Sequence, residues 1–183
     1  PLAQSSFLDS VQSLIIPQVQ GSPSLVMEAL DFALNQQHIM RPTRERCLVS
    51  LKALLVQGIS QVITYNEMHP DFPMTGDHLD LFSKRWLLHS LLWSFSGSTP
   101  WSERNEFSDL LIQKSGMSLP IPVANVADYK VRVQDGEYEL WSDSVPRMEI
   151  ESHQVTSSDI VITTTDTVRH SDILEAWISS RMP

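Results

Sequence analysis

The stretch DHLDLFSKRWLLHSLLWSFSG, residues 77–97, decides the fold. Its first half carries apolar and charged faces at helical spacing, whereas the apolar residues from Trp86 to Phe95 run almost all the way round the helix. A helix that is apolar on every face must be enclosed by other elements. We expect Asp77 to cap its start and Gly97 to close it in the left-handed conformation. The stretch therefore predicts the central helix of a mainly α-helical bundle.

Four more helices are predicted around it from apolar spacing and capping residues. They are expected to cover residues 4–16, 23–40, 44–66 and 103–115. The expected N-caps of the last three are Ser22, Thr43 and Ser102. Gly58, inside the third, costs about 1 kcal/mol relative to alanine and so indicates close packing or a slight bend. Gly116 is expected to close the fourth.

The composition changes near residue 118, which predicts a helical part, 1–118, followed by a strand-rich part, 119–183. Residues 129–133 and 137–141 alternate around Asp135-Gly136, a typical hairpin turn. Two further strands are expected at 148–150 and 160–164. A terminal helix over 166–180 follows. Its predicted inward face consists of Val168, Ile173, Leu174, Trp177 and Ile178.

Charge and cysteine content exclude several classes of protein. The net charge is −9, and the basic residues cluster only at Arg41, Arg44 and Arg46. Nucleic acid is therefore not expected as a partner, because phosphate binding needs a concentrated positive face. The single cysteine, Cys47, falls in an apolar helical pattern and is interpreted as a buried thiol, with a nucleophile as the alternative.

The N-terminal segment PLAQSSFLDS has neither the basic start nor the apolar run of a signal peptide. The apolar run 86–95 is too short to cross a bilayer. We therefore expect a cytosolic chain without a membrane span. The absence of an initial Met and the ending at Pro183 favour a piece of a longer protein.

Motifs for catalysis are missing from the sequence. The six histidines are scattered without metal-ligand spacing, and the glycines lie too far apart for a phosphate-binding loop. The carboxylates Glu149 and Glu151 fit a solvated strand edge. The residues alone thus indicate a helical domain without an active site of its own.

Three stretches resemble the cytoplasmic dynein heavy chain family. They are ITYNEMHPDFPM (63–74), LLHSLLWSFSG (87–97) and DIVITTTDTVRHSDILEAWISSRMP (159–183). The similarity runs in order over residues 25–183, and residues 1–24 match loosely. The resemblance implies that 1–118 is the helical lid of the second AAA+ module. It also implies that 119–183 begins the third module, ahead of its nucleotide-binding loop.

The family resemblance implies the function of a whole motor. Such motors use ATP, with ADP as product and Mg²⁺ as cofactor, to move toward microtubule minus ends in the cytoplasm. Implied partners are neighbouring AAA+ modules, microtubules, dynein intermediate and light chains, and a regulatory WD-repeat protein. The segment itself would link two modules and transmit nucleotide state, and the chain alone is expected to bind no nucleotide and to lack ATPase activity.

The resemblance also implies nucleotide-contacting residues. Arg85 and His89 occupy the part of the lid helix where the family places an arginine that reaches the γ-phosphate. Neutral His89 would suit a module that holds ATP without turnover, while a histidine bonded within the bundle is the alternative. In the tail, the segment before the last helix would lie against the adenine of the nucleotide bound by the third module. Val161, Ile162 and Thr163 would contact it there, with Arg169 nearby. Thr163 stands where the family often has proline.

A second hypothesis is a stand-alone helical adaptor that binds partner helices in a groove, without enzymatic activity. It leaves the strand-rich tail unexplained. The sequence following Pro183 would distinguish the two, because only the motor needs a glycine-rich nucleotide loop there.

Overall fold

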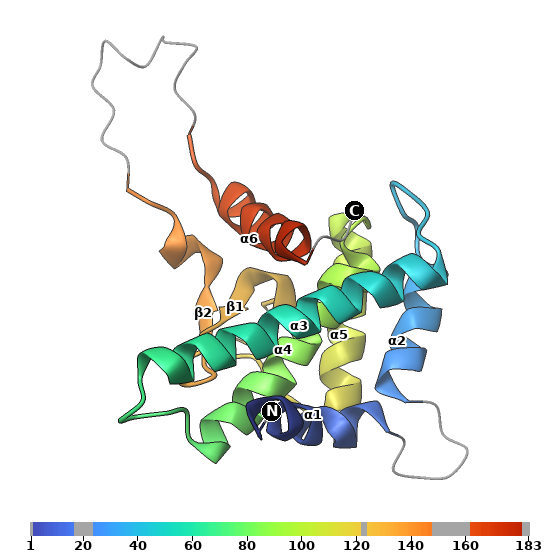
Figure 1. Cartoon of the computed structure of the whole chain (residues 1–183). Coiled ribbons are helices and arrows are strands. Elements are labelled where there is room, and N and C mark those ends of the chain that lie inside the picture. The colour runs from blue at the N-terminus through green and yellow to red at the C-terminus, as the bar shows by residue number, and fades with distance from the viewer. Residues whose placement is uncertain (1, 17–23, 122–123, 148–161, 181–183) are drawn as a thin grey trace, which may run out of the picture.

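The computed structural model describes residues 2–16, 24–121, 124–147 and 162–180. Five helices come first along the chain (Figure 1): α1 (Leu2–Ile15), α2 (Leu25–Leu34), α3 (Arg44–Met68), α4 (Gly76–Ser96) and α5 (Trp101–Ser115). A short hairpin with flanking 3-10 turns follows: η1 (Val126–Asp128), β1 (Tyr129–Val131), β2 (Tyr138–Leu140) and η2 (Trp141–Ser144). Helix α6 (Thr165–Ser179) ends the described chain. The mainly helical class with a hairpin and a terminal helix is confirmed.

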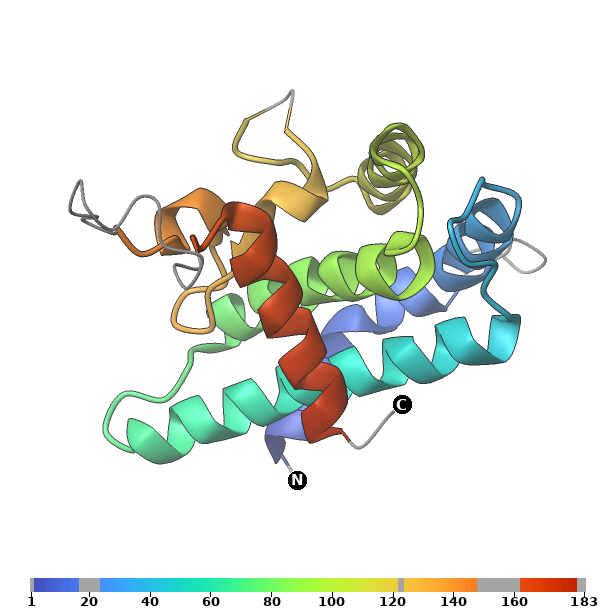
Figure 2. The ribbon, with the colours of Figure 1, turned by 90° about the horizontal axis from the view of Figure 1, so that it is seen from above.

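Helix α4 is the centre of the molecule. Every residue from Trp86 to Trp93 is buried, on all sides of the helix. Helices α1, α2, α3 and α5 all contact α4, and Figure 2 shows α4 running between them. In α1, Phe7 is fully buried with its ring centroid 6.3 Å from that of Phe82. The prediction of an enclosed central helix is confirmed.

The ends of α4 differ from the prediction. Its N-cap is Thr75 rather than Asp77, because the Thr75 hydroxyl accepts the His78 N–H at 3.3 Å. Gly97 is the C-cap, as predicted, but with φ −60° and ψ −28° it is right-handed, so the left-handed closure is wrong. The guanidinium of Arg104 instead donates to the carbonyls at this end, 2.9 Å from Gly97 O and 3.0 Å from Thr99 O. A side chain from α5 thus hydrogen-bonds carbonyl groups at and just after the end of α4.

The starts of α2 and α5 and the end of α2 differ from the prediction. The N-cap of α2 is Ser24 rather than Ser22, which lies outside the described residues. Its end at Leu34, short of residue 40, follows from His38, whose ring bonds Ala33 O at 2.7 Å and Ser98 Oγ at 2.8 Å. Helix α5 starts after Pro100 without a side-chain cap, so Ser102 was the wrong start. Gly116 closes it with φ 68°, as predicted.

Helix α3 confirms its predicted cap and its close contact. Thr43 is the N-cap, and its hydroxyl accepts the Arg46 N–H at 3.2 Å. A Cβ built on Gly58 would lie 2.3 Å from Trp86 Nε1, so the indole packs directly on this glycine. The same Nε1–H donates to Leu54 O at 2.7 Å. Gly58 therefore marks a place where a side chain of α4 packs directly on the backbone of α3.

Two further expectations concern α3. Cys47 is 1% exposed, and burial raises the pKa of its thiol, which confirms a buried cysteine and disfavours a nucleophile. Among the described residues, α3 alone is long and apolar enough to cross a membrane. That is weak evidence for a span, since the core helix of a globular domain passes the same test, and α3 packs against α4, α1 and α6.

The hairpin forms where it was predicted but with shorter strands. Tyr129 pairs with Leu140 and Val131 with Tyr138 in an antiparallel register. The turn includes Asp135, whose carboxylate accepts the Glu137 N–H at 2.9 Å, and Gly136 with φ 71°. These are the only strands in the described residues. Residues 148–161 lie outside the described residues, so the strand expected at 148–150 and the first part of the strand expected at 160–164 fall there. The remaining residues, 162–164, form no strand.

Helix α6 lies across α3 and against η2 (Figure 2). Its bounds match the prediction within one residue, and Thr164 caps it by accepting the Thr167 N–H at 3.2 Å. Its predicted inward face is partly wrong. The buried residues are Arg169, Ile173 and Ala176, whereas Leu174 and Ile178 are exposed. A crossing helix buries only the narrow stripe at the crossing, which is why an apolar pattern overstated the contact.

Candidate functional site

Arg85 joins α4 to the turn of the hairpin. Its guanidinium donates to Gly136 O at 2.8 Å and pairs with the Glu137 carboxylate at 2.5 Å. It also lies 4.5 Å from the centroid of the Tyr138 ring, a cation–π distance. Only 14% of its side chain is exposed. One side chain of α4 thus makes three contacts with three successive residues of the hairpin.

Gly136 allows this turn to lie directly on α4. A Cβ at this position would stand 2.6 Å from Phe82 N and 2.9 Å from His78 O, both backbone atoms. Backbone atoms of a packed helix cannot move aside as a flexible side chain can. The hairpin is therefore held against α4 by shape as well as by Arg85.

His89 lies one turn further along α4 in an aromatic environment. It is 2% exposed, and its ring stacks on Trp86 at 5.1 Å and lies 6.4 Å from both Trp93 and Trp141. Burial lowers the pKa of the ring to about 4, against a smaller opposing effect of a hydrogen bond with the Tyr129 backbone. His89 is thus a neutral imidazole between α4 and the hairpin, with Nδ1 unpartnered in the described residues.

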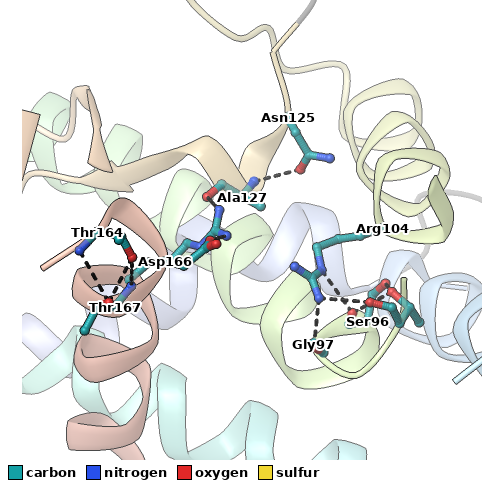
Figure 3. A network of polar contacts seen from close by, with 10 residues as sticks. Ser96, Gly97, Arg104, Asn125, Ala127, Thr164, Asp166 and Thr167 are labelled. Carbon is teal, nitrogen blue, oxygen red and sulfur yellow. Dashed lines mark hydrogen bonds and ion pairs between the residues drawn. The ribbon is translucent and has the colours of Figure 1, made fainter. Parts of the chain in front are cut away.

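Arg169 fixes α6 to the segment before the hairpin. It is 5% exposed and donates to Ala127 O at 3.0 Å, and it pairs with Asp166. Figure 3 shows Ala127 of η1 near Thr164, Asp166 and Thr167, which lie at the start of α6. The guanidinium also lies 5.3 Å from the Trp93 ring centroid. Arg169 therefore connects α6, η1 and α4.

A second buried arginine approaches the same indole. Arg104 lies 5.1 Å from the Trp93 ring centroid while it donates to the end of α4 (Figure 3). Burial lowers the pKa of Arg104, the charge of Arg169 lowers it further, and Asp166 raises it. His170 packs edge-on against Trp93 at 5.7 Å. Trp93 is thus the point where α4, α5 and α6 meet.

The residues expected to contact nucleotide are only partly brought together. His89 and Arg169 both contact Trp93, and Arg85 lies one turn before His89 on α4. Ile162 is 62% exposed and Thr163 half-buried, in irregular chain before α6. Val161 lies outside the described residues.

Comparison with known proteins identifies the family. Residues 21–143 match the model of the dynein heavy chain AAA lid domain. This chain belongs to that family. It is 37% identical over 174 residues to the cytoplasmic dynein heavy chain of Drosophila melanogaster. This alignment covers 93% of this chain and 4% of that protein. The Dictyostelium discoideum relative is 38% identical over 169 residues, covering 92% of this chain and 4% of that protein.

A further relative is the cytoplasmic dynein heavy chain of Caenorhabditis elegans, 36% identical over 169 residues and covering 91% of this chain. The chain spans about 4% of the length of these curated relatives. The resemblance inferred from three sequence stretches is therefore confirmed at the level of the family, and a stand-alone adaptor is disfavoured.

The residues of this dynein lid segment do not by themselves fit a nucleotide. The guanidinium of Arg85 is used by the hairpin, and that of Arg169 by Ala127 and Asp166. His89 is enclosed by indoles, so it could reach a phosphate only if the lid repacked. The chain also lacks a glycine-rich loop with its lysine. No step of ATP hydrolysis follows from these residues, and their contact with nucleotide in a complete motor stays a prediction.

Sequence reasoning missed Arg104 and the docking contact of Gly136. Arg104 stands three residues before Phe107 and seven before Leu111, on the inward face of α5. A charged residue at an apolar position of a helix is the signal that could have identified it. The contact of Gly136 with α4 had no such signal, because it joins segments more than fifty residues apart.

Proposed function

We propose that this segment serves in a dynein heavy chain as the lid of one AAA+ module joined rigidly to the start of the next. The observation that carries the proposal is the docking of the hairpin on α4 by Arg85 and Gly136. If a lid moves with nucleotide state, a hairpin fixed to its central helix must move with it. Movement would then reach the following module without any chemistry in this segment.

The finer parts of this proposal come from the family resemblance. They are the assignment to the second and third modules, the boundary near residue 118, and a contact of Arg85, His89, Val161, Ile162, Thr163 or Arg169 with nucleotide. ATP-driven movement along microtubules in the cytoplasm, with Mg²⁺ as cofactor, belongs to the proposed whole motor. The curated relatives are named cytoplasmic dynein heavy chains, which supports this setting.

The test is Arg85→Ala in the complete heavy chain. Without the guanidinium, the hairpin loses a hydrogen bond, an ion pair and a ring contact, and is expected to separate from α4. We expect microtubule gliding velocity to fall several-fold while ATP turnover persists, because modules that are no longer coupled hydrolyse without producing movement. Velocity and turnover are measured on the same preparation.

Lys114→Ala is the matched control, because Lys114 on α5 forms an ion pair with Glu28 on α2, away from the hairpin, and its side chain is 45% exposed. An exposed pair of this kind contributes little to stability. If Arg85→Ala leaves gliding at the level of the control, the coupling role is excluded. If it instead empties the nucleotide site of the second module, Arg85 contacts nucleotide directly, as the family resemblance implies.

A further inference from the structure

The loop between α3 and α4 is built more firmly than a connection requires. The side-chain oxygen of Asn66 accepts the Met74 N–H at 2.8 Å and closes the loop. The ring of His69 stacks on Tyr65 at 4.4 Å, and its Nδ1 bonds Tyr65 O at 2.9 Å. Phe72 N donates to His69 O at 3.1 Å. With prolines at 70 and 73, the loop has few conformations left to lose.

This braced loop presents apolar side chains to solvent. Phe72 is 81% exposed and Met68 66% exposed, within five residues of each other. Both views place the loop at the edge of the molecule, beyond the other described segments (Figures 1 and 2). Neither of these two side chains belongs to the hydrophobic core. Rigid, exposed aromatic side chains are typical anchors of protein interfaces, because little entropy is lost when they bind.

The charges around the loop indicate what it would bind. Glu67, Asp71 and Asp77 are exposed, and none of them takes part in an ion pair among the described residues. No lysine or arginine occurs from residue 53 to residue 83. Along the sequence, the charged residues nearest to the apolar tip are therefore carboxylates, with His69 and His78 as the nearest histidines. The complementary surface is an apolar pocket with a basic rim.

We propose that the loop 67–74 docks Phe72 and Met68 into an apolar pocket with a lysine- or arginine-rich rim on another domain of the same heavy chain. The commitment to the same chain rests on the proposed function: this segment spans about 4% of the length of its relatives, and in the proposed motor the remainder of the heavy chain would surround it. Phe72 would fill the pocket, and Asp71 and Glu67 would face its rim.

The test places a photo-crosslinking phenylalanine analogue at position 72 of the complete heavy chain. A second preparation carries it at Ile39, which is 80% exposed and lies in a different loop. We expect a several-fold higher yield at position 72, with the crosslinked peptide in the same heavy chain and containing apolar residues flanked by lysine or arginine. Equal yields at the two positions, or a crosslink to a separate polypeptide, would overturn the proposal.

A second variant tests the charge argument. With the photo-reactive residue at position 68, Asp71→Lys is expected to reduce the crosslink several-fold, and Asp71→Asn to reduce it less. An unchanged yield with Asp71→Lys would contradict a basic rim. The Arg85→Ala measurement does not involve this loop, so failure of the docking proposal leaves the coupling result standing, and the reverse also holds.

Discussion

Replacing Gly136 with alanine is expected to lower the free energy of unfolding by about 3 kcal/mol. Two costs combine. A side chain at φ 71° is strained, and the new Cβ would stand 2.6 Å from Phe82 N, so the hairpin must lift from α4. Lifting also lengthens the bond from Arg85 to Gly136 O. Chemical denaturation of the purified chain, followed by tryptophan fluorescence, measures the loss.

Gly116→Ala is the control for this experiment. Gly116 has nearly the same backbone angle, φ 68°, but a Cβ there would meet nothing within 4 Å. Its replacement is expected to cost only the strain of the left-handed conformation, about 1 kcal/mol. The difference between the two variants isolates the contact of the hairpin with α4. Equal losses would show that the turn of the hairpin does not press on the helix.

Acidification is expected to destabilise the chain through His89 by about 3 kcal/mol between pH 7 and pH 4. The pKa of His89 is about 4 in the folded chain and 6.5 without burial. Between these values the unfolded state binds more protons, so stability rises with pH and is lost as the pH falls toward 4. The cause is burial of the ring among Trp86, Trp93 and Trp141, which removes the water that would solvate a positive charge.

The comparison with His89→Gln removes the contributions of the other titrating groups, which both proteins share. Glutamine keeps a polar group near the Tyr129 backbone but has no proton to gain in this range. We expect the free energy of unfolding of the variant to change less with pH between 4.5 and 7 than that of the unsubstituted chain. Parallel pH profiles would mean that His89 is already charged, or is accessible to water, in the folded state.

The core of the fold could be predicted because its signal is local. A run from Trp86 to Phe95 that is apolar on all faces has few placements other than the centre of a bundle. The Asp135-Gly136 turn and the cap at Thr43 are likewise properties of a few adjacent residues. The position of these elements in the chain was therefore predictable before any tertiary contact was known.

Features that depend on tertiary contacts could not be predicted in this way. Gly97 ends α4 as predicted, but it is not left-handed, and Arg104 from the next helix donates to the carbonyls there, which no local rule indicated. Arg85 lies on the charged face of α4, and its cover by the hairpin had no signal within the helix itself. His89 shows the same limit in part, because one of the three indoles that surround it, Trp141, is fifty-two residues away in the chain.

The central claim is that the hairpin and the lid helices form one rigid connector. Spin labels at Ser60 on α3 and Ser142 in η2, both exposed, report this directly in the complete heavy chain. The measurement is the distance distribution between them without nucleotide, with ADP and with a non-hydrolysable ATP analogue. One narrow distribution that stays the same in all three states is the predicted result. A distance that changes with nucleotide would contradict a rigid connector.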